Sequence, residues 1–128
     1  MMLMKQLKLL LLIGMLSPAF AYAQKAYEAV KYTGKVQNMV VRFTLADGYL
    51  GACEVKLTDG KTHKTISFLP ENGSADENKN LTFYRRNGSP KTDRFVISGM
   101  EELFETPPAK IKGIYYTKGK GSPFILKR

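Results

Sequence analysis

The stretch that decides the fold lies between Met39 and Leu69 and contains three runs, MVVRFTL (39–45), YLGACEVKLT (49–58) and THKTISFL (62–69). Apolar and polar residues alternate in these runs, and a period of two is typical of strands that bury one face. Asp47-Gly48 and Asp59-Gly60 separate the runs and supply residues that tolerate a positive φ in a turn. The stretch therefore predicts a three-stranded antiparallel meander.

Matching the apolar faces predicts a register for each hairpin. A two-residue turn at Asp59-Gly60 places Cys53 opposite Ile66 and Lys56 opposite His63. For the first hairpin, a two-residue turn would put Phe43 on the wrong face. A three-residue loop with a left-handed Gly48 instead pairs Phe43 with Gly51, and a slip of one residue would invert every side chain.

Outside this meander, similar short runs alternate with turn residues every 8–12 residues, as in all-β sandwiches and barrels. The fold class predicted is all-β, an antiparallel meander of seven or eight strands that closes into a small barrel or a two-layer roll. If its five central phenylalanines are buried together, they fill the interior and leave no room for a small ligand. The strands expected are 29–36, 39–45, 49–58, 62–69, 80–86, 94–98, 110–117 and 123–127, and the phenylalanines are Phe43, Phe68, Phe83, Phe95 and Phe124.

One short helix is expected from Ser98 to Glu105, between the last strands. Ser98 and Glu101 have the spacing of a capping box, in which each side chain bonds the other residue's backbone N–H. Met100, Leu103 and Phe104 would form its apolar face. Pro107 and Pro108 would end it.

Residues 1–23 have the features of a secretory signal peptide. Lys5 and Lys8 precede an apolar run, and Ala21 and Ala23 provide the small side chains that signal peptidase requires. Cleavage is expected after Ala23, with Ala21 as the alternative. The apolar run is too short to span a bilayer, so no transmembrane segment is expected after cleavage. Residues 24–128 then form a single secreted β domain, in the periplasm or at the cell surface.

Cleavage of the leader lowers the net charge that the exported domain presents to a partner. The whole chain has 20 basic and 11 acidic residues, a net charge of +9. Two of the basic residues lie in the leader, so 18 against 11 remain and the exported domain has a net charge of +7. Such a charge favours anionic partners.

No catalytic residue, metal site or cofactor is expected. The chain has one Cys and one His, and the predicted register places Cys53 and His63 on opposite faces of the sheet, where they cannot form a catalytic pair. Cys53 is therefore expected to be a small buried residue. The segment from Asp76 to Asn80 matches the first three ligands of a calcium loop, but Leu81 follows where that loop needs glycine.

The charge pattern is the feature that points to a function. The C-terminal hairpin, residues 110–128, contains six basic residues and no acid, with tyrosines between the cations. A second basic group includes Arg85, Arg86, Lys91 and Arg94. This pattern predicts a non-enzymatic binding protein for an anionic polymer or lipid headgroup of the cell envelope; export makes nucleic acid an unexpected partner. The ligand-binding residues expected are Lys110, Lys112, Tyr115, Tyr116, Lys118 and Lys120.

Three alternatives stay open on the sequence alone. The basic residues could form a solvated sheet face whose tyrosines fill the edge of the core. The chain could be an inhibitor or accessory subunit that binds a protein partner through the exposed turn at 74–80. It could also be a hydrolase whose site depends on acids such as Asp76 or Glu101.

Overall fold

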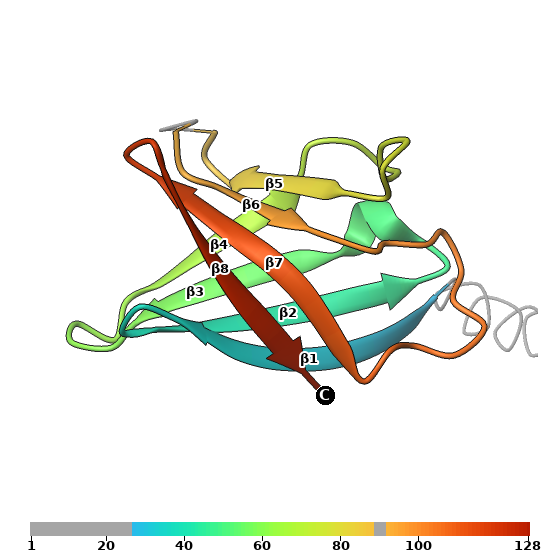
Figure 1. The fold of residues 1–128 in the computed structure, drawn as a ribbon, viewed down its shortest axis with the longest axis horizontal. Coiled ribbons are helices and arrows are strands. Elements are labelled where there is room, and N and C mark those ends of the chain that lie inside the picture. The colour runs from blue at the N-terminus through green and yellow to red at the C-terminus, as the bar shows by residue number, and fades with distance from the viewer. Residues whose placement is uncertain (1–26, 89–91) are drawn as a thin grey trace, which may run out of the picture.

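The strands form one closed antiparallel barrel in the computed structural model, which describes residues 27–88 and 92–128 (Figure 1). Each strand pairs with the next one in sequence, and the last pairs with the first. The prediction of an all-β barrel is confirmed, whereas the signal peptide lies outside the described residues. The strands are β1 (Glu28–Val36), β2 (Met39–Asp47), β3 (Glu54–Asp59), β4 (Thr65–Pro70), β5 (Leu81–Arg85), β6 (Arg94–Ile97), β7 (Lys110–Thr117) and β8 (Lys120–Lys127).

Aromatic side chains fill the interior of the barrel. The five phenylalanines singled out in the sequence are all at most 5% exposed. The ring of Phe95 lies edge-on to Phe68 at 4.8 Å and to Phe124 at 5.7 Å between ring centroids. Phe43 and Phe83 make a similar contact at 5.9 Å. Edge-to-face contacts of this kind add to the free energy gained by burial. The centre of the barrel is therefore packed with side chains.

Both predicted hairpin registers are wrong by four residues. Phe43 pairs with Val55 and Lys56 pairs with Ser67. The β2–β3 connection is longer than predicted because a 3₁₀ turn, η1 (Leu50–Ala52), follows β2. The β3–β4 turn is longer because Asp59 Oδ1 accepts the backbone N–H groups of Lys61 and Thr62. An even shift keeps each side chain on its predicted face, so the predicted inside and outside of these strands are right.

The predicted helix at 98–105 is absent from the described structure. Gly99 adopts a φ of +69°, which is outside the helical region. Tertiary partners satisfy the backbone N–H groups: Met100 donates to Lys79 O, and Phe104 donates to Asp47 Oδ1. Met100 is buried but Leu103 is 71% exposed, so the expected apolar face does not form. A helix this short has too few internal bonds to compete with such partners.

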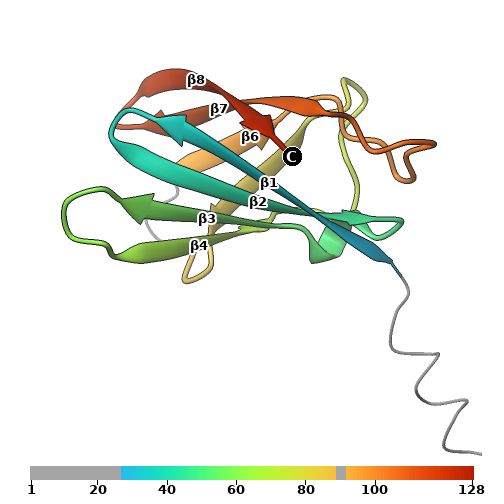
Figure 2. The same ribbon diagram turned by 90° about the horizontal axis from the view of Figure 1, so that it is seen from below.

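The connections divide the barrel into two ends (Figures 1 and 2). In a meander, the β1–β2, β3–β4, β5–β6 and β7–β8 turns lie at one end, and the three other connections lie at the opposite end.

Closure between β1 and β8 depends on a close approach of two backbones. A Cβ atom at Gly34 would lie 2.4 Å from the carbonyl oxygen of Ile125, so only glycine fits there.

Candidate basic end of the barrel

The predicted binding residues on strand β7 lie on two different faces of the sheet. Lys110 and Lys112 are exposed on the outer face, and Tyr116 lies half-buried on the same face. Tyr115 points inward, is 4% exposed, and stacks on Phe95 with 4.6 Å between ring centroids. Burial raises the pKa of Tyr115. Its ring belongs to the core, as the alternative of a tyrosine-filled core edge proposed.

The β7–β8 turn carries two of the predicted lysines. Lys118 and Gly119 form a two-residue turn with φ angles of +50° and +78° between the paired residues Thr117 and Lys120. Such a tight turn with two positive φ angles matches the twist of the flanking strands. Both Lys118 and Lys120 are exposed. The hairpin therefore presents these two cations at its tip, away from Lys110 and Lys112 at the other end of β7.

Basic side chains from all four hairpins gather at the tip of the barrel. A meander places the β1–β2, β3–β4, β5–β6 and β7–β8 turns at one end, so cations that are distant in the sequence share a surface. Most of them are exposed. Lys91, which the sequence grouped with Arg86, lies outside the described residues. We call this surface the basic end; it comprises Lys35, Lys61, Lys64, Arg85, Arg86, Arg94, Lys118 and Lys120.

The two acids at the basic end are both engaged in local structure. Asp59 accepts two backbone N–H groups of its own turn, which lower the pKa of its carboxyl group. Asp93 accepts from Arg85 Nη2 at 2.6 Å and from Thr117 Oγ1 at 2.9 Å. The remaining cations of this end form no ion pair among the described residues, although Arg94 lies 4.2 Å from the ring centre of Tyr116 in a cation–π contact.

All the other acids lie at the opposite end. Nine of the 11 acidic residues are in, or directly beside, the β2–β3, β4–β5 and β6–β7 connections and the start of β1. We call this surface the acidic end. Its acids are Glu28, Asp47, Glu54, Glu71, Asp76, Glu77, Glu101, Glu102 and Glu105. The barrel is thus electrically polarised along its length, and a dense anionic surface would attract the basic end.

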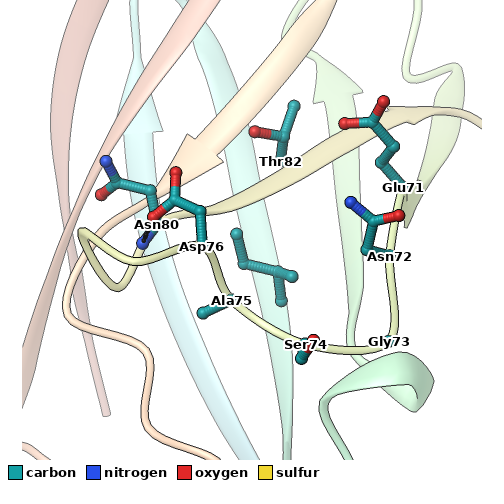
Figure 3. A pocket seen from close by; sticks show the side chains of 9 residues that line it. Glu71, Asn72, Gly73, Ser74, Ala75, Asp76, Asn80 and Thr82 are labelled. Carbon is teal, nitrogen blue, oxygen red and sulfur yellow. Dashed lines mark hydrogen bonds between the residues drawn. The ribbon is translucent and has the colours of Figure 1, made fainter.

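A polar pocket of about 460 Å³ lies at the acidic end between β4 and β5 (Figure 3). Glu71 and Asn72 line one side, and Asp76 and Asn80 line the other. Asp76 Oδ1 accepts the backbone N–H groups of Asn78 and Asn80, both at 2.9 Å, which closes a compact turn. In the part of the chain that the structure describes, no three His, Cys, Asp or Glu side chains are grouped to hold a metal ion.

Cys53 and His63 lie in different environments, one buried and one exposed. Cys53 is 1% exposed, as predicted, and its Sγ atom accepts the backbone N–H of Ala46 at 3.3 Å. His63 is exposed in the β3–β4 turn with a φ of +60°, although it was predicted to lie in a strand. Neither residue is placed to activate the other as a nucleophile and base.

Sequence reasoning found part of the basic end but grouped it by position in the chain. Lys35, Lys61 and Lys64 were missed because each lies in a different hairpin from the C-terminal cluster. A usable signal was present: in an up-and-down meander, cations beside alternate turns must meet at one end. Conversely, Lys110 and Lys112 were grouped with Lys118, although Lys110 begins the eight-residue strand β7 and Lys118 follows its last residue.

Similarity to known proteins does not assign a function. Comparisons with protein-family models, with curated proteins and with solved structures find no match to this chain. Within the described ranges, no helix is long and apolar enough to cross a membrane.

Proposed function

We propose that this protein is a small exported, non-enzymatic binding protein whose basic end engages an anionic component of the cell envelope. The gathering of eight cations at the basic end, where the only two described acids are both engaged in local structure, carries the proposal. Export is inferred from residues 1–23, which have a basic start, an apolar run and small residues at Ala21 and Ala23.

The charge distribution favours an extended anionic surface over a single small anion. The cations of the basic end come from four separate turns, and most are exposed lysines on flexible stems. Exposed lysines of this kind attract any dense negative charge, because their flexible stems do not fix the direction of a hydrogen bond. A rigid arginine fork, by contrast, matches the geometry of a single anion. A polymer with repeated phosphates or a membrane rich in anionic headgroups provides such a field.

Binding of the full exported chain to two probes tests the proposal. The probes are polyphosphate and vesicles that mix phosphatidylglycerol with phosphatidylcholine. A triple variant, Lys61→Ala with Lys118→Ala and Lys120→Ala, removes three cations of the basic end. Each basic residue near an anionic surface contributes about 1 kcal/mol, so this variant should bind roughly a hundredfold more weakly at low salt.

A second triple variant serves as the matched control. Lys31→Ala with Arg42→Ala and Lys56→Ala removes the same charge from the side of the barrel, where all three residues are exposed. It should weaken binding far less than the first variant. Equal losses would show that only net charge matters, and unchanged binding at high salt would exclude an electrostatic contact. Preference for one probe identifies the partner as a polymer or a membrane.

A protein partner is the second candidate function. The observation that favours it is the fixed shape of the exposed turn at 74–80, where Asp76 accepts two backbone N–H groups and Lys79 O accepts the N–H of Met100. A preformed loop loses little entropy on binding a protein. Pull-down from an envelope extract at high salt should then retain a partner that Asp76→Ala releases.

A further inference from the structure

A groove runs along the outer face of β7 and β8, away from the basic end. Two outward-facing pairs, Lys112 with Ile125 and Ile114 with Pro123, form its walls, and the Gly113–Phe124 pair lies between them. Its volume is about 660 Å³, which is within the range of small-molecule pockets, about 300–1,000 Å³. The groove is not part of the proposed basic end, so the inference drawn from it goes beyond the proposed function.

The groove continues past Lys112 into a second hollow of about 330 Å³. Ser98 and Lys112 line both hollows. Phe104 and Pro108 of the long β6–β7 connection provide apolar walls on the far side, together with Ile111. The two open hollows meet at Ser98 and Lys112, and we call them together the β7 groove.

The β7 groove exposes apolar side chains on the outer face of the sheet. Ile125 is 50% exposed, and Pro123 is exposed beside it. Ile114 of β7 pairs with Pro123, so the three apolar side chains are contiguous, and contiguous apolar surface is a feature of ligand-binding grooves. The packed core of the barrel cannot supply that ligand site, because aromatic rings fill it.

Only positive charges line the β7 groove. Lys110 and Lys112 are its charged residues, and no Asp or Glu lines either hollow. Neither lysine forms an ion pair or side-chain hydrogen bond within residues 27–88 and 92–128. The two lysines are alternate residues of one strand, so their Cα atoms are about 7 Å apart and one small anion can contact both ammonium groups.

We propose that the β7 groove binds a long-chain fatty acid, with its carboxylate on Lys110 and Lys112 and its acyl chain along Ile114, Pro123 and Ile125. The apolar walls of the larger hollow match part of one acyl chain, and the pair of unpaired lysines beside it matches one carboxylate. Each methylene group that the groove removes from water strengthens binding roughly fourfold. The chemistry therefore requires both the apolar walls and the charge.

Displacement of the fluorescent fatty acid cis-parinarate from the exported chain measures binding below the concentration at which the lipids form micelles. Palmitate should displace it, and laurate should do so less well because fewer methylenes are buried. Hexadecyltrimethylammonium, which has the same chain length and the opposite charge, should fail. Equal displacement by the cation would overturn the proposal, since the lysines would then have no role.

Two substitutions with matched controls locate the site. Lys112→Glu should weaken palmitate about tenfold or more, while Lys120→Glu, at the basic end, should not. Ile125→Ser should weaken it, while Leu69→Ser, at an exposed leucine of β4 outside the groove, should not. All four residues are exposed, so folding should survive and circular dichroism checks it. Palmitate binding that Lys120→Glu or Leu69→Ser weakens equally would overturn the β7 groove and leave the basic end unaffected.

Discussion

At the scale of single residues, Gly113 illustrates how the filled interior restricts the sequence. A Cβ atom there would lie 2.5 Å from Cζ of Phe124 and 3.0 Å from Cδ1 of Ile97, and both side chains are buried. Gly113→Ala should therefore lower the free energy of unfolding by about 1–3 kcal/mol, because an overpacked core must shift its side chains. Urea denaturation measures the change.

Gly73 provides the control for Gly113. It lies in the exposed β4–β5 connection, has no positive φ, and has no atom within 4 Å of the position of a Cβ. Gly73→Ala should change the free energy of unfolding by less than about 1 kcal/mol, with stabilisation expected from the lower entropy of the unfolded chain. Similar losses at both glycines would contradict the packing account.

Cys53 gives a prediction that depends on pH. Burial raises the pKa of its thiol from a value near 9.0 to about 11, although the bond from the Ala46 N–H acts in the opposite direction. The folded protein should therefore react with Ellman's reagent at pH 8 far more slowly than the chain unfolded in urea, since the thiolate is the reactive form. Fast reaction in the folded state would contradict the burial of this thiol.

The same pKa shift has a defined effect on stability. A raised folded-state pKa means that the native chain binds more protons, so the stability that it contributes is complete below about pH 9 and is lost as the pH rises towards 11. Wild type and Cys53→Ala should accordingly converge in free energy of unfolding over that range. Thermal denaturation at several pH values tests this.

At the scale of elements, the ion pair between Arg85 and Asp93 links β5, β6 and β7. Asp93 Oδ2 binds Arg85, Oδ1 binds Thr117 of β7, and the Asp93 side chain is 10% exposed. Asp93→Asn keeps the size and one acceptor but leaves the guanidinium without its anion. Because Arg85 Nε already has no partner among the described residues, the loss should be about 1–3 kcal/mol by urea denaturation.

An exposed ion pair serves as the comparison for Asp93. Lys56 and Glu54 lie 3.6 Å apart on the outer face of β3, with side-chain exposures of 52% and 28%. Glu54→Gln should cost less than about 1 kcal/mol, because water and salt screen an exposed pair. A larger loss at Glu54 than at Asp93 would show that burial does not govern the contribution of these pairs.

The strands could be predicted from local pattern because the period of two reports which face is buried. The pairing registers could not, because they depend on how long each connection is. The η1 turn and the Asp59 turn lengthen two connections through contacts that alternation does not encode. The sequence signals thus determine side-chain direction more reliably than pairing partner.

In the segment at 98–105, local sequence signals predict the wrong secondary structure. A capping box and a spaced apolar face are helix signals, yet Gly99 takes a left-handed φ and Met100 bonds the distant Lys79 carbonyl. Those partners exist only once the barrel is formed. Local propensity therefore loses to tertiary contacts in a segment too short to stabilise its own helix.

At the scale of the whole molecule, the order of pairing makes a prediction about folding. Seven of the eight strand pairs join neighbours in sequence, and only β1–β8 joins the two ends of the domain. Closing the longest loop has the largest entropic cost, so hairpin contacts should form before the seam between β1 and β8. The transition state should then resemble an open sheet that includes β2, β3 and β4.

Two buried substitutions test that order. Leu126 lies on β8 beside Gly34 at the seam, and Val55 lies on β3 between Phe43 and Phe68; both are 0% exposed. Leu126→Ala should lower the free energy of unfolding by about 2–5 kcal/mol, mainly by speeding unfolding, because its contacts form after the transition state. Val55→Ala should mainly slow folding. Stopped-flow folding and unfolding rates in urea distinguish the two, and a φ-value for Leu126 equal to or above that for Val55 would mean that the barrel closes early.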